Sequence, residues 1–343
     1  MMKNTRILGL FILLMAGNVY GQTRLAFEAL TFVKDIAYYK NKPYTGTTTS
    51  VYDDKTRAEE VNWKNGLLDG LKTEFYNGAG VHAKYFFKEG KRNGPFEIFF
   101  KNGQTESKGY YIDDQLDGEI LGYYPRGNIR YTHTYDHGVE NGISKTWFEN
   151  GVLQQEGTVL IGKVHGTLKS YYEDSSIRSE IVYHLGTRNG KAYKWHTTGC
   201  LGEESYYKMG ILDSVYRLYD NLLCQLLQEV NYKKGKKFGV SMSFTQLGDT
   251  VSLETYEYDQ LHGPWVLYQD KKREAFGNYV KGEKDGFWYT GLVSDFQHCE
   301  GAYDMGVQVG KWMYFDHKKR KLAMRIYDDN GKIVKQKVYR KIE

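Results

Sequence analysis

Residues 135–166 read YDHGVENGISKTWFENGVLQQEGTVLIGKVHG, and this stretch holds one full period of the chain. Gly142 and Gly166 are 24 residues apart, and nearly the same spacing runs from Gly46 to Gly310. Such a short fixed period indicates an array of structural repeats. It also makes an enzyme less expected. In a repeat array, conspicuous residues such as glycines and aromatics recur because each repeat needs them to fold, not because they catalyse a reaction. After Gly46 the repeat glycines, which we expect to be structural, are Gly70, Gly94, Gly118, Gly142, Gly166, Gly190, Gly239, Gly263, Gly286 and Gly310. Ser214 replaces the glycine at the remaining position.

Other positions also carry the same kind of residue in most repeats, at a constant distance from the repeat glycine, and we call each such position a register. Four residues before the repeat glycine stands a second glycine, replaced by Asp114 and Asp259 in two repeats. Asp tolerates positive φ better than most residues, so this register predicts a left-handed backbone. Aromatic residues recur seven positions before the repeat glycine and five positions after it, as Tyr135 and Trp147 do around Gly142. Nine positions after the repeat glycine there is often a turn signal, such as Asn150-Gly151.

These registers predict one β-hairpin per repeat. In the quoted stretch we expect strands over residues 143–148 and 152–159, an Asn-Gly turn between them and a loop over residues 162–166. A lone hairpin is marginal in water, so the hairpins must stack. The predicted fold is all-β: about twelve stacked 24-residue hairpins in an elongated, open, twisted, single-layer antiparallel sheet. A propeller of paired hairpins would require alternation at the doubled period, and the registers show none.

The two ends of the chain differ from the array. Residues 1–21 have a basic start, an apolar run over residues 7–16 and a small-residue exit, as in a secretory signal peptide. An uncleaved anchor is the alternative, and no later stretch is apolar enough to cross a membrane. The predicted organisation is a signal peptide over 1–21, a lead-in over 22–37, hairpin repeats over 38–331 and a tail over 332–343. We therefore expect export to the periplasm, to the cell surface or out of the cell.

Composition narrows the function further. Removal of Lys3 and Arg6 lowers the formal charge from +5 to +3, which is too weak for nucleic acid binding by a chain of this length. The 31 tyrosines and 38 glycines with only 4 prolines favour strands and turns. Cys200, Cys224 and Cys299 are too few and too widely spaced for a disulfide framework. One disulfide would be compatible with export, but three buried thiols are the favoured interpretation.

The pattern Tyr-x-x-Gly-x-x-x-Gly resembles the MORN (membrane occupation and recognition nexus) repeat. Good copies are Tyr135 to Gly142, Tyr183 to Gly190 and Tyr303 to Gly310, the last followed by Trp312. The bacterial variant in YwqK-family antitoxins is the most similar form, and the resemblance covers residues 38–331. It implies a scaffold or a protein-binding surface, with lipid contacts in some members. The antitoxin role would imply a partner toxin, which fits poorly with a signal peptide.

Residues that suggest chemistry have simpler explanations. Asp and Asn often precede the repeat glycine, but none of these sites completes a calcium loop, and loop geometry accounts for them. His133 and His137 lack a third ligand for zinc. No nucleophile-and-base motif is present, so we expect no catalytic residue, metal or cofactor. The recurrent aromatics could bind sugars, but stacking between hairpins explains them better. The basic run Lys318 to Lys321 is expected to be a solvated hairpin tip.

The least regular repeat is the candidate partner site. Between Ser214 and Gly239 one residue is inserted, and leucines stand where other repeats carry polar residues. A local rule broken inside a regular array suggests function, although a bulge that adjusts the twist is an equal alternative. The candidate residues are Leu222, Leu223, Leu226 and Leu227. The predicted function is an exported, non-enzymatic scaffold for protein–protein interaction at a bacterial cell envelope. The alternatives are a glycan or cell-wall binding module, an antitoxin-like partner of a toxin and, last, a hydrolase.

Overall fold

The computed structural model describes residues 24–78, 80–293 and 296–340, and nearly all of its elements are β-strands. The predicted signal peptide, residues 1–21, lies outside the described residues. Contacts divide the chain into two compact units. One runs through Gly118 and includes Pro125–Gly127, and the other comprises Glu119–Tyr124 and Asn128 onward. Each unit is an open antiparallel sheet of consecutive hairpins, so the all-β prediction is confirmed.

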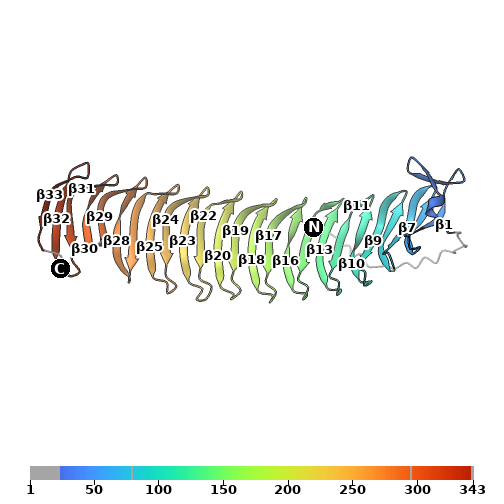
Figure 1. The fold of residues 1–343 in the computed structure, drawn as a ribbon, viewed down its shortest axis with the longest axis horizontal. Coiled ribbons are helices and arrows are strands. Elements are labelled where there is room, and N and C mark those ends of the chain that lie inside the picture. The colour runs from blue at the N-terminus through green and yellow to red at the C-terminus, as the bar shows by residue number, and fades with distance from the viewer. Residues whose placement is uncertain (1–23, 79, 294–295, 341–343) are drawn as a thin grey trace, which may run out of the picture. The chain divides into compact units, whose positions relative to one another are not determined.

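The first unit consists of one sheet and a small separate sheet (Figure 1). The antiparallel order follows the chain from β5 to β11, and β1 adds a parallel strand next to β5. The strands β2, β3 and β4 form the small sheet. The elements are β1 (Leu25–Ala26), η1 (Phe27–Ala29), β2 (Thr31–Val33), β3 (Ile36–Tyr39), β4 (Lys42–Pro43), β5 (Gly46–Val51), β6 (Arg57–Lys64), β7 (Leu67–Phe75), β8 (Val81–Lys88), β9 (Lys91–Phe99), β10 (Thr105–Ile112) and β11 (Gln115–Leu116). The predicted lead-in thus folds into β1, η1, β2 and the start of β3.

In the second unit the strands from β13 to β33 lie side by side in chain order, from green to red in Figure 1. The last strand, β33, falls within the predicted tail and pairs with β32. The strands are β12 (Gly118–Tyr123), β13 (Ile129–Asp136), β14 (Val139–Glu140), β15 (Gly142–Trp147), β16 (Leu153–Leu160), β17 (Lys163–Tyr171), β18 (Ile177–His184), β19 (Thr187–Trp195), β20 (Leu201–Lys208), β21 (Ile211–Leu212), β22 (Ser214–Tyr219), β23 (Leu226–Lys233), β24 (Lys236–Phe244), β25 (Thr250–Glu257), β26 (Gln260–Leu261), β27 (Gly263–Gln269), β28 (Lys272–Val280), β29 (Glu283–Val293), β30 (Phe296–Asp304), β31 (Val307–Phe315), β32 (Lys321–Tyr327) and β33 (Ile333–Val338).

The predicted loop over residues 162–166 is in fact a tight turn followed by a strand. Leu160 pairs with Lys163, so Ile161 and Gly162 alone form the turn, and their φ angles are 52° and 71°. Two consecutive residues at positive φ define the type I′ hairpin turn. Asp114 and Asp259 occupy the second position of such turns at φ 68° and 74°, as predicted for this register. Strand β17 then runs straight through Gly166, because a two-residue turn reverses the chain completely.

The Asn-Gly register forms the turn at the other end of each hairpin, and its loop has three residues. The Phe148 N–H donates to the carbonyl of Val152, and the Gly151 N–H donates to the carbonyl of Phe148, both at 2.9 Å. Gly151 has a φ of 86°, which makes a type I turn followed by a left-handed residue. Asn150 Oδ1 accepts a hydrogen bond from the Val152 N–H at 3.0 Å and supports this loop.

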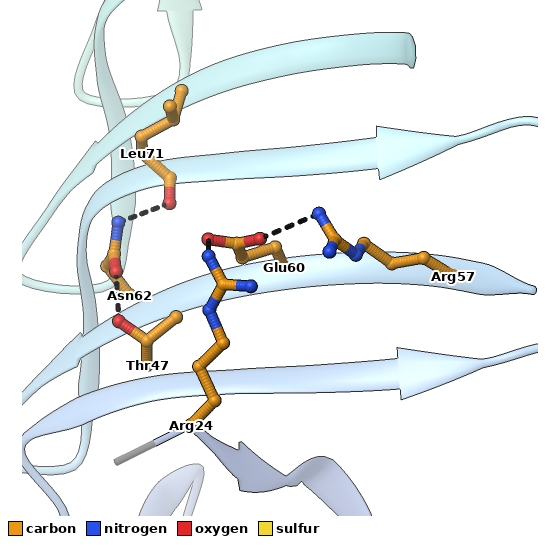
Figure 2. Close-up of polar contacts among 6 residues, drawn as sticks. All are labelled: Arg24, Thr47, Arg57, Glu60, Asn62 and Leu71. Carbon is orange, nitrogen blue, oxygen red and sulfur yellow. Dashed lines mark hydrogen bonds and ion pairs between the residues drawn. The ribbon is translucent and has the colours of Figure 1, made fainter. Parts of the chain in front are cut away.

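The repeat glycine lies at a bulge, inside a long strand in some repeats, as Gly70 does in β7, and at the start of a strand in others, as Gly142 does in β15. All eleven repeat glycines have φ between 63° and 151°. Eight positions upstream, a polar side chain donates to the carbonyl that follows the glycine: Asn62 Nδ2 to Leu71 at 2.9 Å (Figure 2), and the Thr134 hydroxyl to Ile143 at 3.2 Å. The Thr47 hydroxyl donates to Asn62 Oδ1 at 2.7 Å and holds the amide in place. The bulge therefore keeps its carbonyl satisfied, although the carbonyl leaves the strand ladder.

Ser214 adopts the same backbone as the glycines it replaces, with a φ of 102°. A side chain in this region is strained, typically by about 1–3 kcal/mol. The pairing of Ser214 with Tyr232 matches that of Gly142 with Val159. The array therefore imposes this backbone on whichever residue stands there.

Each unit has its own apolar core. In the first, Leu30, Ala37, Val61 and Trp63 are buried together. In the second, Trp288 and Trp312 are fully buried against Tyr279, Tyr303 and Tyr327. Gly277 faces Trp288, and an added Cβ would lie 2.2 Å from the indole. A glycine in one strand therefore makes room for a tryptophan in the next.

Candidate interaction surface

The two faces of the second sheet carry different side chains, because successive strand residues point to opposite faces. What we call the charged face carries two rows of alternating Lys or Arg and Glu on neighbouring strands, separated by Tyr193 of β19: Lys145, Glu156, Lys169 and Glu180 in the first row, and Glu204, Arg217 and Glu229 in the second. Arg217 lies between Glu229 and Glu204, at 2.8 and 2.9 Å, and its hydrogen bonds to Glu229 and Glu204 raise its pKa further above the ordinary value. Exposed ion pairs contribute little stability singly, so the charged face mainly orders neighbouring strands.

The opposite, aromatic face holds Trp265, Tyr279, Trp288, Tyr303, Trp312 and Tyr327. The rings of Tyr279 and Trp288, and those of Tyr303 and Trp312, meet edge to face with centroids 5.0 Å apart. The indole N–H groups of Trp288 and Trp312 each donate to a backbone carbonyl at 3.0 Å. These rings stack on one another, so the two buried tryptophans offer no surface to a sugar.

A tyrosine register that the sequence pattern did not single out joins successive hairpins at the three-residue turns. The hydroxyl of Tyr172 donates to the carbonyl of Trp195, 23 residues on, at 2.7 Å. Tyr52, Tyr76 and Tyr124 make the same bond, each to the carbonyl 23 residues on. The sequence signal was available, because these residues directly follow the register of aromatics five positions after the glycine. Each bond adds about 1 kcal/mol and fixes the spacing of adjacent hairpins.

The Asp and Asn residues before the repeat glycines also join neighbouring hairpins. Asp213 Oδ1 accepts a hydrogen bond from the Lys234 N–H at 3.0 Å, and Asn189 Oδ1 accepts from the Met209 N–H at 3.1 Å. Asp69 and Asp285 make equivalent bonds to the next type I′ turn. A structural role in turn geometry therefore accounts for this register.

The four candidate leucines do not share one surface. Leu222 and Leu223 are exposed in the hairpin loop that contains the inserted residue. Leu226 and Leu227 are half-buried at the start of β23, and as consecutive strand residues they point to opposite faces. The insertion therefore lengthens a loop, and Asp220 orders that loop by accepting from the backbone N–H groups of Leu222 at 2.8 Å and Leu223 at 2.6 Å.

The same loop carries a disulfide between Cys200 and Cys224. The two residues hold the same register in successive hairpins, which brings their Cα atoms to 5.1 Å, within the range for a disulfide. The favoured interpretation of three buried thiols was therefore wrong for this pair, and Cys299 alone is a buried thiol. Sequence spacing could not show the pairing, because a separation of 24 residues becomes a contact only once the hairpins stack.

A serine, a histidine and a carboxylate meet near the start of the second unit. The Ser144 hydroxyl lies 2.9 Å and Glu140 Oε1 lies 2.8 Å from the same His133 nitrogen, Nδ1. A catalytic relay requires the nucleophile and the acid on different ring nitrogens. The adjoining cavity has a volume of only about 150 Å³, well below the usual size of a ligand site. This cluster is therefore a hydrogen-bonded packing group.

Three successive type I′ turns expose apolar side chains, and we call them the apolar turn row. Ile161, Leu185 and Met209 occupy the first turn position at φ 52°, 46° and 50°. Ile161 is 69% and Met209 78% exposed, and Leu185 is also exposed. Neighbouring hairpins are about 10 Å apart, so the three side chains form a regularly spaced series along one edge of the sheet. Asn, Asp or Gly is generally preferred at this position, but this array also places Glu89, His137, Lys234 and Tyr258 there, so the row differs from its neighbours in being apolar.

Comparisons with known proteins support the repeat assignment. Residues 92–113, 116–137, 140–159 and 164–184 match the MORN repeat variant, and every match begins two residues before a repeat glycine. The chain therefore contains repeats of a type that mediates interactions with proteins or membranes. The narrower YwqK resemblance remains a prediction. No curated protein matches the chain. In the part of the chain that the structure describes, no helix has the length and apolarity needed to cross a bilayer.

Solved structures add little. One match is a crystal structure of TcdB2-TccC3, with 10% identity, 89% of this chain covered and a TM-score of 0.17. Another is the TcdB2-TccC3-Cdc42 crystal structure, with 10% identity, 89% covered and a TM-score of 0.18. A third is the Photorhabdus luminescens Tc holotoxin pore with TccC3-D651A, with 10% identity, 90% covered and a TM-score of 0.15. This chain spans between 17% and 21% of those chains, and scores this low carry no argument about function.

Proposed function

We propose that this chain is an exported, non-enzymatic repeat scaffold that binds protein partners at a bacterial cell envelope. The apolar turn row carries the proposal. A β-branched residue such as Ile161 is costly at positive φ, and an exposed apolar side chain gains nothing from water. Three such residues in succession are explained if a partner covers them.

Two observations support the location. The first 21 residues have the pattern of a secretory signal. The disulfide between Cys200 and Cys224 suits an oxidising compartment outside the cytoplasm.

The test replaces Ile161, Leu185 and Met209 together by Asn. Asn is favoured at the first position of a type I′ turn, so the variant should be at least as stable as the wild type. Cross-linking in envelope extract should then recover a protein on the wild type and lose it on the variant. The control is Leu247→Asn. Leu247 is also exposed, but it lies in a three-residue loop at the other end of the hairpins, so this variant should keep the partner. Equal recovery on all three proteins would refute the role of the row.

Glycan binding is the second candidate, and one groove favours it. The groove has a volume of about 490 Å³ and is lined by Tyr172, Trp195, His196, Lys194 and Glu203 among others. Lys194 Nζ and Glu203 Oε2 are 2.8 Å apart and offer hydrogen bonds beside aromatic rings, as sugar sites require. A glycan array tests it: binding that Trp195→Ala abolishes would favour this function. The antitoxin-like role has only the family resemblance behind it.

A further inference from the structure

A second groove opens at the one repeat whose glycine is missing. It has a volume of about 610 Å³ and is lined by Ser214 together with residues of β20, β23 and β24. Ser214 is exposed there at its strained φ of 102°. A strained residue beside a cavity is a reason to look for function, because selection must tolerate its cost.

The groove and its rim are strongly basic. Lys208 and Lys233 line it, and Lys234, Lys236 and Lys237 belong to the adjoining turn and to the start of β24. No ion pair joins any of these five lysines to a carboxylate within the described residues. The single acidic residue that lines the groove, Asp213, already accepts from the Lys234 N–H. Lys233 and Lys236 stand directly opposite each other, which is unfavourable for like charges without a counter-charge.

Apolar surface lies between these charges. The groove is lined by Tyr206, which is exposed, and by half-buried Phe238, whose ring lies 4.5 Å from Lys233 Nζ. Ile211 is exposed and pairs with Lys208. Met209, the last residue of the apolar turn row, lies between Lys208 and Ile211 in the turn that joins β20 to β21. The groove therefore continues the row that supports the proposed function.

We propose that this groove binds an acidic segment of the partner protein. An aromatic or aliphatic side chain of that segment would lie between Tyr206 and Phe238, and flanking carboxylates would meet Lys208, Lys233 and Lys236. Unpaired lysines around apolar rings are complementary to such a segment in both charge and polarity. Aromatic rings between the lysines offer contacts to an inserted side chain, which the headgroups of a bilayer do not supply. This inference rests on the proposed function, because it names the chemistry of the scaffold's partner.

The experiment uses the full mature chain and a fluorescein-labelled peptide of about twelve Asp and Glu residues with one central Trp. Fluorescence polarisation at physiological salt should show saturable binding. Lys233→Glu with Lys236→Glu should weaken it about tenfold or more, because two attractions become repulsions. Lys88→Glu with Lys91→Glu is the matched control: those lysines hold the same registers beside Gly94 and also pair directly, so affinity should stay within about twofold. Replacing the peptide's Trp by Ala should also weaken binding.

Three results would overturn the inference. An equal loss of peptide affinity in both double variants would show that the peptide is attracted by overall charge and not bound at this groove. No binding of the peptide, with binding to phosphatidylglycerol vesicles that depends on Lys233 and Lys236, would assign the groove to lipid. Unchanged recovery of cross-linked partners on Lys233→Glu, Lys236→Glu would leave the scaffold function standing and refute this groove. If the wild type cross-links no protein at all, the proposed function fails instead, whatever the peptide does.

Discussion

Replacing Gly142 by Ala tests why the repeat glycine is required. Gly142 has a φ of 141°, and an added Cβ would lie 2.8 Å from Thr134 Cβ and 3.1 Å from Thr134 Cγ2. The backbone strain costs roughly 1–3 kcal/mol. Moving Thr134 away also removes its hydrogen bond to Ile143, worth about 1 kcal/mol. We therefore expect a total loss of about 2–4 kcal/mol.

The control is Gly286→Ala, at the same register of another hairpin. Gly286 has a φ of 68°, close to the left-handed region that non-glycine residues do visit, and an added Cβ meets nothing within 4 Å. Only the backbone cost of about 1 kcal/mol applies there. Because stability in a repeat array is largely local, native-state hydrogen exchange is the assay. Amides of β13 and β15 should lose more protection in the first variant than amides of β28 and β29 lose in the second. Equal losses would refute both added costs at Gly142, the contact with Thr134 and the greater backbone strain at φ 141°.

Three further predictions concern the irregular repeat. Ser214→Gly should stabilise the hairpin by about 1 kcal/mol because it removes the strain at φ 102°, and a lower urea midpoint would contradict this. Hydrogen bonds from the Leu223 and Leu222 N–H groups hold the pKa of Asp220 below its ordinary value, so its contribution to stability exists above about pH 4 and disappears as pH falls through the folded-state pKa. Asp220→Ala should therefore destabilise at pH 7, with a difference that shrinks in denaturation curves below about pH 4; a constant difference would argue against ionisation. Leu223→Ser with Leu227→Ser should leave partner association and the circular dichroism strand signal intact, because the two leucines share no surface and lie at the hairpin ends opposite the apolar turn row; weaker association would support this loop as a partner site.

The local pattern of the sequence predicted most of the hairpin. Strands β15 and β16 agree with the expected ranges within one residue, because alternation and turn residues are local signals. The sequence predicted one loop over residues 162–166, whereas the structure has a turn at Gly162 and a bulge at Gly166. The difference has a physical reason. Both glycines have positive φ, and the residue types alone do not show that one reverses the chain while the other stays within a strand.

The candidate site was less predictable. Leu222 and Leu223 attracted attention as apolar residues in an irregular repeat, and both are exposed. The apolar turn row escaped notice because Ile161 and Met209 look like ordinary strand residues until the turn type is known. The groove at Ser214 escaped notice for a different reason: its lysines are spread over 30 residues of sequence and meet only once the hairpins pair.

By itself, the sequence determined the period, the all-β class and the positions that need a left-handed backbone, because these requirements act within one hairpin and recur in each. Only the tertiary structure decided which residues of different hairpins meet. The disulfide of Cys200 with Cys224, the bond of Tyr172 to Trp195 and the edge-to-face contact of Tyr303 with Trp312 all depend on strand register and on the bulge at each repeat glycine. A shift of one residue in that register would turn every strand side chain to the opposite face, so the surfaces of the array exist only once neighbouring hairpins have paired.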